Sequence, residues 1–382
     1  MKALFLNANL AGVGTYHRAL WFARMLAEAG HEATVCTVSR QNKFTRRRYL
    51  DRKGVEIIEG PNFGLNFWPG RGSNFIDILE RISYLQSGAY DVVYAFEYHP
   101  NVSWPVYLAL KGRRLLSDWC DLYAGAANVF HGSKIMHRWD AVREAKIRLK
   151  ADLVTVISDF LGKRAEGLGL PKEKIILIRE GVDTNYMRPF EKNAVRAKLG
   201  LPQDALLLTT LQDGAAFPPL VECVSQLRKD FAKVALYFVG RPKPEQKLLA
   251  EKAGLKENET FYCTGFCSDE DLPRYLSAGD VAVLPMVDSL ANRSRFPHKI
   301  GDYLACGLPV AVTDVGEYPA LLKQEGLGVV AAPGVAFTEA LLAYLKNSEK
   351  RAEDALRSRS WVKENLDWQV LKPTIVKCVE GN

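Results

Sequence analysis

Apolar, β-rich runs alternate with helical stretches along almost the whole chain, and this alternation constrains the fold more than any other feature. Strands that alternate with helices form parallel sheets with helices on both faces. The sequence therefore predicts an α/β protein with two Rossmann-like doubly wound domains. The expected strands are 3–7, 33–38, 55–59, 91–96, 114–118, 153–158 and 174–179 in a first series, and 205–211, 234–239, 261–264, 281–285, 309–313 and 328–332 in a second.

A polar, proline-containing stretch at Met187–Asn193 separates the two series of strands. Such stretches are typical of domain boundaries. We therefore expect an N-terminal domain at residues 1–190 and a C-terminal domain at 191–360. The last helical stretch, 361–382, is a candidate to complete the first domain.

Composition narrows the class of protein. The chain has 382 residues, 48% of them apolar, which is enough for two ordinary cores. No apolar run reaches the ~18 residues that a membrane span needs, and the opening segment Met1–Asn7 shows no cleavage pattern. Seven scattered cysteines favour reduced thiols and a cytoplasmic location. Cys263 and Cys267 lack a second pair of ligands, so no metal site is expected.

The positive charge is unevenly distributed. Residues 1–190 contain 27 Lys and Arg against 19 Asp and Glu, an excess of +8 that exceeds the net charge of +7 of the whole chain. No nucleic-acid-binding motif accompanies this excess, so no nucleic-acid partner is expected. The run Arg46–Arg48 precedes an aromatic loop at Phe63–Trp68. That pattern fits either peripheral contact with an anionic membrane or an ordinary solvated face.

The segment from Arg293 to Val310 joins a basic loop, a helix with one acid and a Gly/Pro break before a strand. The N-terminus of a helix presents backbone N–H groups and the positive end of its dipole, which stabilise a phosphate. Arg293, Arg295 and Lys299 add positive charge there. Asp302 lies one turn into the helix, where an acid can accept hydrogen bonds from a ribose. The segment therefore indicates a site for a nucleoside diphosphate.

Asp302-Tyr-Leu-Ala-Cys-Gly-Leu-Pro-Val310 resembles the donor-site helix of the large retaining family of GT-B glycosyltransferases. Three further stretches resemble segments of that family in the same order. They are Gly12-Val-Gly-Thr-Tyr-His-Arg18, the pair Asp152–Ser158 with Ile178–Pro189, and Tyr275–Pro285. Together they extend over most of the chain.

The resemblance implies two domains facing across a cleft, a nucleotide-sugar donor such as a UDP- or GDP-sugar, retention of anomeric configuration and no obligatory metal. The family usually has two glutamates eight positions apart in the donor site. Here Ser294 stands at the first position and Asp302 at the second. The usual cations after the first strand of the second domain are absent from Leu211–Phe217. Phosphate neutralisation is then expected from Arg241, Arg293, Arg295 and above all Lys299.

The first domain offers further candidates in loops after its strands. Gly12 and Gly14 allow close backbone approach to a donor or acceptor. The third glycine of a dinucleotide fingerprint is missing, which disfavours a dehydrogenase. His99, Asp118 and Asp121 are candidates for proton handling or acceptor orientation, with Asp121 preferred. Each of the three also fits a plain helix-cap or turn role.

These observations favour a nucleotide-sugar-dependent glycosyltransferase of polysaccharide biosynthesis that acts on a glycan, a lipid-linked saccharide or a small molecule. Two alternatives remain. One is a sugar-nucleotide epimerase or phosphorylase on the same architecture. The other is a non-catalytic nucleotide-sugar-binding protein, which the serine at position 294 favours.

Overall fold

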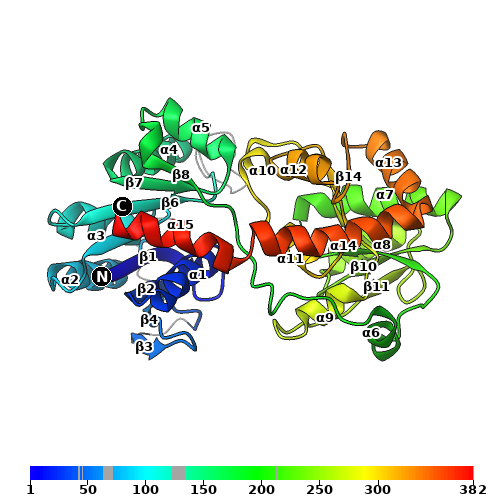
Figure 1. The fold of residues 1–382 in the computed structure, drawn as a ribbon, viewed down its shortest axis with the longest axis horizontal. Coiled ribbons are helices and arrows are strands. Elements are labelled where there is room, and N and C mark those ends of the chain that lie inside the picture. Colours follow the sequence, from blue (N-terminus) through cyan, green and yellow to red (C-terminus); the bar gives the residue numbers. More distant parts are fainter. Residues whose placement is uncertain (42–43, 45, 63–71, 123–133, 212–213, 382) are drawn as a thin grey trace. The chain divides into compact units, whose positions relative to one another are not determined.

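The structure is a computed structural model that describes residues 1–41, 44, 46–62, 72–122, 134–211 and 214–381. The chain divides into two compact units (Figure 1). Unit 1 comprises Met1–Arg179 with Trp368–Asn382, and unit 2 comprises Glu180–Asp367. The chain thus passes between the units at residues 179–180 and again at 367–368. The first passage lies earlier than the Met187–Asn193 stretch suggested, because residues 182–187 pack with unit 2.

Unit 1 is built on an eight-stranded sheet in the order β3-β4-β2-β1-β5-β6-β7-β8. Its neighbouring strands pair in parallel except β3, which is antiparallel to β4. The strands are β1 Lys2–Leu10, β2 Glu32–Val38, β3 Arg47–Leu50, β4 Glu56–Gly60, β5 Val92–Phe96, β6 Arg114–Trp119, β7 Leu153–Val156 and β8 Ile175–Leu177. The helices are α1 Thr15–Glu28, α2 Phe75–Gln86, α3 Pro100–Ala109, α4 Lys134–Lys150, α5 Asp159–Gly167 and α15 Trp368–Glu380, with a short 3-10 turn η2 at Lys172–Lys174.

Unit 2 has a six-stranded parallel sheet in the order β11-β10-β9-β12-β13-β14. The strands are β9 Leu206–Thr210, β10 Val234–Phe238, β11 Phe261–Cys263, β12 Val281–Leu284, β13 Val310–Thr313 and β14 Gly328–Ala331. The helices are α6 Lys192–Leu199, α7 Phe217–Asp230, α8 Pro244–Lys252, α9 Leu272–Ser277, α10 Leu290–Ser294, α11 His298–Ala305, α12 Tyr318–Glu325, α13 Val335–Lys346 and α14 Ser348–Asn365, with a 3-10 turn η3 at Gly214–Ala216. The predicted fold class is confirmed: both units are α/β layers around sheets that are parallel except for the edge strand β3.

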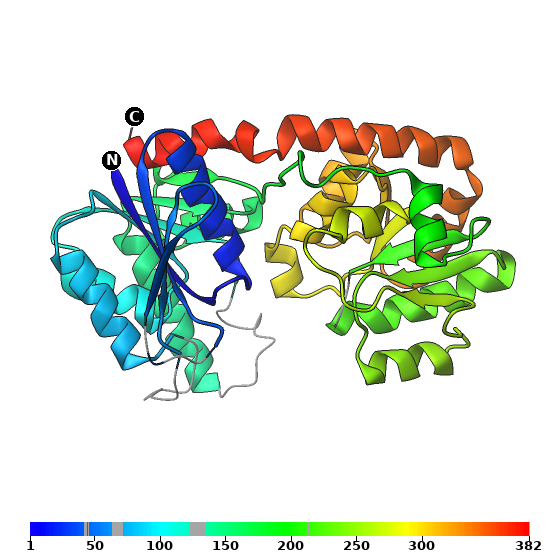
Figure 2. The ribbon, with the colours of Figure 1, turned by 90° about the horizontal axis from the view of Figure 1, so that it is seen from below.

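The C-terminal helix α15 belongs to unit 1, where it lies beside α1 (Figure 2). The Trp368 ring stacks on Trp21 with their centroids 5.5 Å apart, and Trp368 is buried in the same core as Phe22 and Tyr94. Arg114 donates to the Val379 carbonyl at 2.7 Å. A chain segment from the far end of the sequence therefore completes the core of the first unit.

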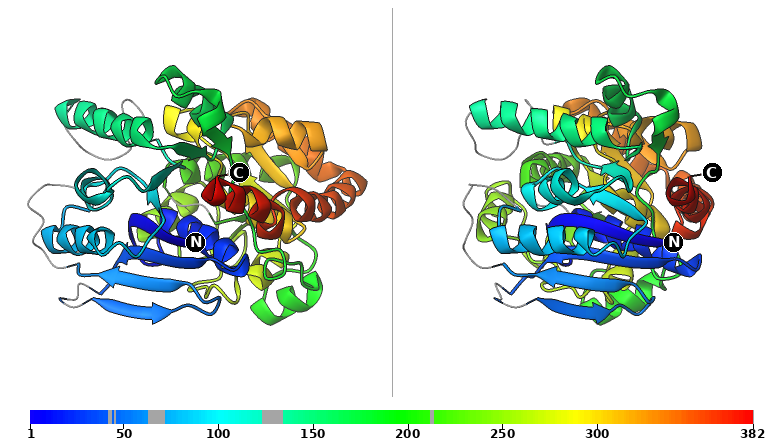
Figure 3. Two further views of the ribbon diagram at one scale, coloured as in Figure 1. Left: turned by 60° about the vertical axis from the view of Figure 1, so that its left-hand side comes forward. Right: turned by 90° about the vertical axis from the view of Figure 1, so that its left-hand side faces the viewer.

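Among the described strands, β3 is the one that the sequence did not predict. It lies at one edge of the unit 1 sheet (Figure 3), and all four of its residues are exposed. Arg47 lies 3.9 Å from Glu59 and Arg48 lies 3.6 Å from Glu56 across the β3–β4 pair. Arg46 donates to the Tyr84 hydroxyl. The basic run thus contributes to a charged edge strand, a common protection against edge-to-edge pairing of sheets. The aromatic loop Phe63–Trp68 lies outside the described residues.

Within the described residues, no helix is long and apolar enough to cross a bilayer.

Candidate functional site

Helix α11 is held rigidly at the carboxyl end of the unit 2 sheet. The Tyr303 hydroxyl accepts a hydrogen bond from the Leu211 N–H at 2.7 Å, and the Lys299 ammonium donates to the Leu211 carbonyl at 2.8 Å. Leu211 immediately follows β9, so both of its backbone groups are bound by α11 side chains. In open α/β sheets, ligands bind at this edge. Helix α11 begins at His298, and the preceding Pro297 provides no side-chain cap for its first N–H groups. The helix therefore presents its N-terminus where a phosphate can use it.

The first passage between the units packs against α11. A Cβ at Gly301 would lie 2.7 Å from Cγ2 of Val182, so glycine permits this close approach. At the other end of the helix, Gly307 adopts φ +73° and turns the chain into β13. The Gly/Pro break seen in the sequence thus ends the helix and starts the next strand.

Asp302, predicted to bind ribose, is buried, with a side chain only 7% exposed. Nε2 of His298, one helical turn earlier, lies 3.1 Å from its Oδ2. Nδ1 of the same ring lies 3.9 Å from Oε1 of Glu180. The negative charge of Asp302, its hydrogen bond and the charge of Glu180 raise the pKa of His298 to about 9, against the opposing effect of burial. The ring is therefore an imidazolium at neutral pH.

His298 was not among the site residues predicted from the sequence. The signal that identifies it is the i,i+4 spacing from His298 to Asp302, which places two side chains on the same helix face. The contact with Glu180 comes from a segment far away in the sequence, so spacing within α11 gives no indication of it.

The basic loop before α11 is partly neutralised by its own neighbours. Arg293 makes two hydrogen bonds to Asp288, Nε to Oδ1 and Nη2 to Oδ2, each 2.6 Å long. Ser294 is fully buried and its hydroxyl donates to the Ala291 carbonyl at 2.8 Å. Ser294 therefore does not reach solvent. The Arg293 guanidinium is exposed, but it is already paired with Asp288.

Arg295 and Arg241 complete the predicted set of cations in unit 2. Arg295 is partly buried at the end of α10 and Arg241 is exposed after β10. Phe296 stacks on Tyr318 with ring centroids 3.9 Å apart, and a Cβ at Gly316 would lie 2.8 Å from the Asn292 carbonyl oxygen. The loop after β13 therefore fixes the backbone that carries Arg295.

A separate cavity of about 340 Å³ lies in unit 2 between α7 and the start of α13. Its lining includes Glu222, Met286, Asp288 and Thr338. Asp288 is the partner of Arg293, but none of the predicted donor residues lines this cavity. The predicted site at α11 and this cavity are thus different places.

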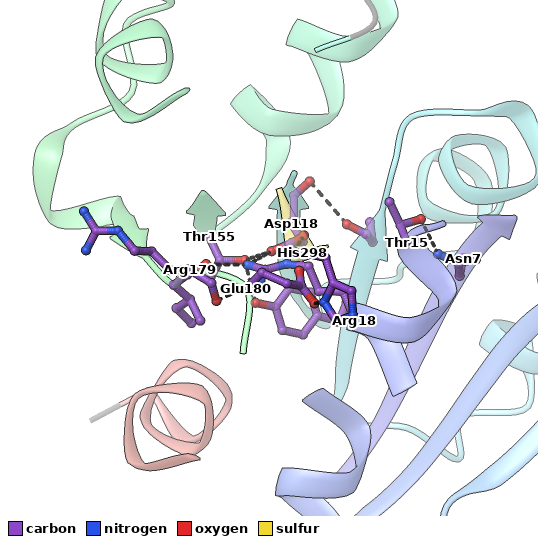
Figure 4. A network of polar contacts seen from close by, with 12 residues as sticks. Asn7, Thr15, Arg18, Asp118, Thr155, Arg179, Glu180 and His298 are labelled. Carbon is purple, nitrogen blue, oxygen red and sulfur yellow. Dashed lines mark hydrogen bonds and ion pairs between the residues drawn. The ribbon is translucent and has the colours of Figure 1, made fainter. Parts of the chain in front are cut away.

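In unit 1, Gly12 and Gly14 have φ of +73° and +57°, which favours glycine at both positions. Gly14 precedes α1 without a side-chain cap, and a Cβ on it would lie 3.1 Å from Nδ2 of Asn9. Asn7 donates to the Thr15 hydroxyl at 2.8 Å (Figure 4). The glycine loop therefore places the first turn of α1 at the end of β1.

Asp118 is buried and fully engaged. Arg18 donates to its two oxygens at 2.9 and 3.0 Å, and the Thr155 hydroxyl donates at 2.7 Å (Figure 4). Arg18 also donates to the Ile178 carbonyl at 2.7 Å. This arrangement joins α1, β6, β7 and the end of β8, which is what a structural ion pair does.

His99 and Asp121 follow neighbouring strands of the same sheet, β5 and β6. His99 is the N-cap residue of α3, and its carbonyl accepts a hydrogen bond from the Ser103 N–H at 2.8 Å. Its ring stacks on that of Tyr98. Burial, followed by the charges of Asp118, Glu97 and Asp121, raises the pKa of the Cys120 thiol well above its usual value. The charges of Glu97, Asp118 and Asp121 therefore all act on the Cys120 thiol.

Glu97 was not among the sequence candidates, yet it is buried and has φ of 81°. A positive φ in a residue with a side chain is uncommon, and such strained residues cluster at active sites and ligand clamps. No sequence signal identifies it, because the conformation depends on the packing around β5.

Two family models match the chain. Glycosyltransferase Family 4 matches residues 12–186 and Glycosyl transferases group 1 matches residues 207–347. The chain belongs to the GT-B glycosyltransferases. Both units of the chain are thus matched, each by a model for its own half.

Curated relatives of the chain are named as glycosyltransferases. The putative colanic acid biosynthesis glycosyltransferase WcaL of Escherichia coli is 22% identical over 264 residues, 67% of this chain and 64% of that protein. The amylovoran biosynthesis glycosyltransferase AmsK of Erwinia amylovora is 24% identical over 57% of this chain and 53% of that protein. The matches thus span less than two thirds of these relatives.

Among solved structures, sucrose-phosphate synthase of Thermosynechococcus elongatus has a TM-score of 0.79 at 17% identity and covers 100% of this chain and 98% of that one. Anabaena HepE in complex with UDP and glucose has a TM-score of 0.77 at 17% identity, with 100% of both chains covered. At this identity the likeness concerns the fold.

Proposed function

We propose that this glycosyltransferase moves a sugar from a nucleoside-diphosphate sugar to a hydroxyl group of a glycan acceptor, with retention of anomeric configuration and without an obligatory metal. The observation that carries the proposal is the placement of Lys299 and Asp302 on α11 at the carboxyl end of the unit 2 sheet. The relatives named for colanic acid and amylovoran biosynthesis support a glycan acceptor. HepE, solved with UDP and glucose, supports a UDP-sugar as donor.

The proposed donor contacts divide by chemistry. Asp302 accepts a hydrogen bond from the ribose, and the N-terminus of α11 with Lys299 meets the diphosphate. When the bond between the anomeric carbon and the diphosphate oxygen breaks, negative charge grows on the leaving group. Preorganised positive groups then lower the barrier. Arg241 and Arg295 supply further charge, and Arg293 contributes by exchanging Asp288 for phosphate.

On the acceptor side we assign proton handling or acceptor orientation to Asp121 and His99. Asp118 holds the strand ends through Arg18 and Thr155, so we assign it a supporting position. Gly12 and Gly14 provide backbone close to the reacting groups. A lipid-linked acceptor at an anionic membrane remains part of the proposal, although Arg47 and Arg48 are paired with Glu59 and Glu56.

The test is release of nucleoside diphosphate from a panel of UDP-, GDP-, ADP- and CMP-sugars, with and without acceptor. Thermal shift ranks the panel first, because ligand at 100 times its dissociation constant adds about 2.7 kcal/mol of stability. Acceptor-dependent release with the product in the donor's anomeric configuration, unchanged by EDTA, supports the proposal. Turnover of donor alone would indicate an epimerase or hydrolase instead.

A non-catalytic nucleotide-sugar-binding protein is the second candidate. The buried Ser294, whose hydroxyl donates to the Ala291 carbonyl, favours it because no carboxylate occupies that position. Tight nucleotide binding without turnover over a broad panel of acceptors would select this candidate.

A further inference from the structure

The side chain of His298 lies between two acids that are themselves nearly buried. The ring is 54% exposed, whereas the side chains of Asp302 and Glu180 are 7% and 10% exposed. Nε2 lies 3.1 Å from Asp302 and Nδ1 lies 3.9 Å from Glu180. An imidazolium has a donor on each ring nitrogen, so one ring can serve both carboxylates.

Lys299, the neighbouring cation, has a different contact. Its ammonium donates to the Leu211 carbonyl at 2.8 Å. Among the contacts that the structure describes for Asp302, the ion pair is with His298. The acid proposed to bind ribose is therefore oriented by a histidine on its own helix.

We propose that His298 is a positioning residue for the donor. Its imidazolium fixes the rotamer of Asp302 through Oδ2 and leaves Oδ1 to accept a ribose hydroxyl. This inference rests on the proposed function, since it assigns His298 a part in binding the same nucleoside diphosphate. Preorganising the acid before the ligand arrives lowers the cost of ordering it on binding.

The charges around His298 determine the pH range in which its ring is protonated and can hold Asp302. Asp302 on α11 and Glu180 at the start of unit 2 favour the protonated ring, while Lys299 and burial oppose it. The balance raises the pKa to about 9. The ring therefore keeps its charge at pH 7 and loses it as the pH rises toward and beyond 9, when the charge that holds Asp302 is lost.

Glu180 gives the cluster a second connection. It is the first residue of unit 2, and Val182, two residues later, lies against Gly301 of α11. The Val182 N–H also donates to the Leu366 carbonyl at 2.7 Å. His298 is thus anchored to a segment that is itself fixed within unit 2, which restricts how the ring can turn.

The experiment measures nucleoside-diphosphate affinity by calorimetry between pH 6.5 and 9.5, using the nucleotide that thermal shift selects. The variants are His298→Gln, which keeps a donor without charge, and His298→Ala, which removes both. His31→Gln is the matched control, because His31 pairs with Glu380 at 3.2 Å in unit 1. The His298→Gln profile also records any titration of the nucleotide base.

As the pH rises from 6.5 to 9.5, we expect the affinity of the wild type for the nucleoside diphosphate to fall about fivefold more than that of His298→Gln. A factor of this size is what a half-exposed ion pair contributes. The control should follow the wild type. NMR titration should place the His298 pKa near 9 in the wild type and lower it in Asp302→Asn.

Identical pH profiles for the wild type and His298→Gln would overturn the positioning role and leave the proposed function standing. Absence of nucleotide binding by the wild type across the whole panel would overturn the proposed function and this inference together. If His298→Ala fails to fold, the His298→Gln profile and the NMR titration still decide the question.

Discussion

Two pairs of a cation and an aspartate, one in each unit, differ in how far they are buried, and so in the role that we propose for each. In unit 1 the Arg18 and Asp118 side chains are 2% and 0% exposed, and Thr155 adds a hydrogen bond. In unit 2 the His298 ring is 54% exposed beside a nearly buried Asp302. The first pair has no face open to a ligand, whereas the second presents a titratable group to solvent. Sequence position alone made both aspartates site candidates, and their surroundings separate them.

The largest expected effect breaks the buried pair. Asp118→Ala leaves the Arg18 guanidinium buried without its partner and should lower the free energy of unfolding by about 3 to 5 kcal/mol. Chemical denaturation followed by circular dichroism measures this. The double variant Arg18→Met, Asp118→Leu should lose less than Asp118→Ala, because no charge is then left unpaired. A double variant that is less stable than the single one would contradict this reading of the pair.

The corresponding change in unit 2 should affect binding rather than folding. Asp302→Ala should weaken nucleoside-diphosphate binding by about 1 to 3 kcal/mol, the usual cost of an unmatched buried polar group. Calorimetry gives the dissociation constant, and thermal unfolding checks the fold. Unchanged affinity would remove the ribose contact from Asp302.

Removal of Lys299 and removal of Arg293 should have different effects on kcat. Lys299→Ala should lower kcat about tenfold or more if, as proposed, the ammonium stabilises the negative charge that grows on the diphosphate in the transition state. Arg293→Ala should have a smaller effect, since the guanidinium is already held by Asp288. Steady-state kinetics of both variants settles their order, and an Arg293 effect as large as that of Lys299 would show that the Asp288 pair opens during turnover.

The smallest effect concerns stability and pH. The His298 pKa is raised above its ordinary 6.5 to about 9, so its contribution to stability is complete below pH 6.5 and lost as the pH rises to 9. Because the ring is half exposed, we expect a loss of only about 1 kcal/mol over this window. Denaturation of the wild type and His298→Gln at pH 6.5 and 9 measures the difference. An equal change in the free energy of unfolding between pH 6.5 and 9 for the two proteins would show that the folded state does not favour the charged ring.

The sequence predicted the core strands of both units because parallel strands are buried on both faces and so appear as continuous apolar runs. It missed β3, whose residues are exposed and charged and which pairs at an edge. The helix that carries Lys299 and Asp302 was also predicted, because the Gly/Pro break that ends it is a local signal. The pairing of Arg293 with Asp288 and the burial of Ser294 could not be predicted, since both depend on how α10 folds back on its own loop.

Hydrogen–deuterium exchange with and without the selected nucleoside diphosphate tests whether unit 2 binds the donor at α11. Binding there should slow exchange at the amides that open α11, at His298–Ile300, and at Leu211 after β9. Protection confined to the lining of the separate cavity, at Glu222–Gln226 of α7 and Val335–Thr338 of α13, would contradict it.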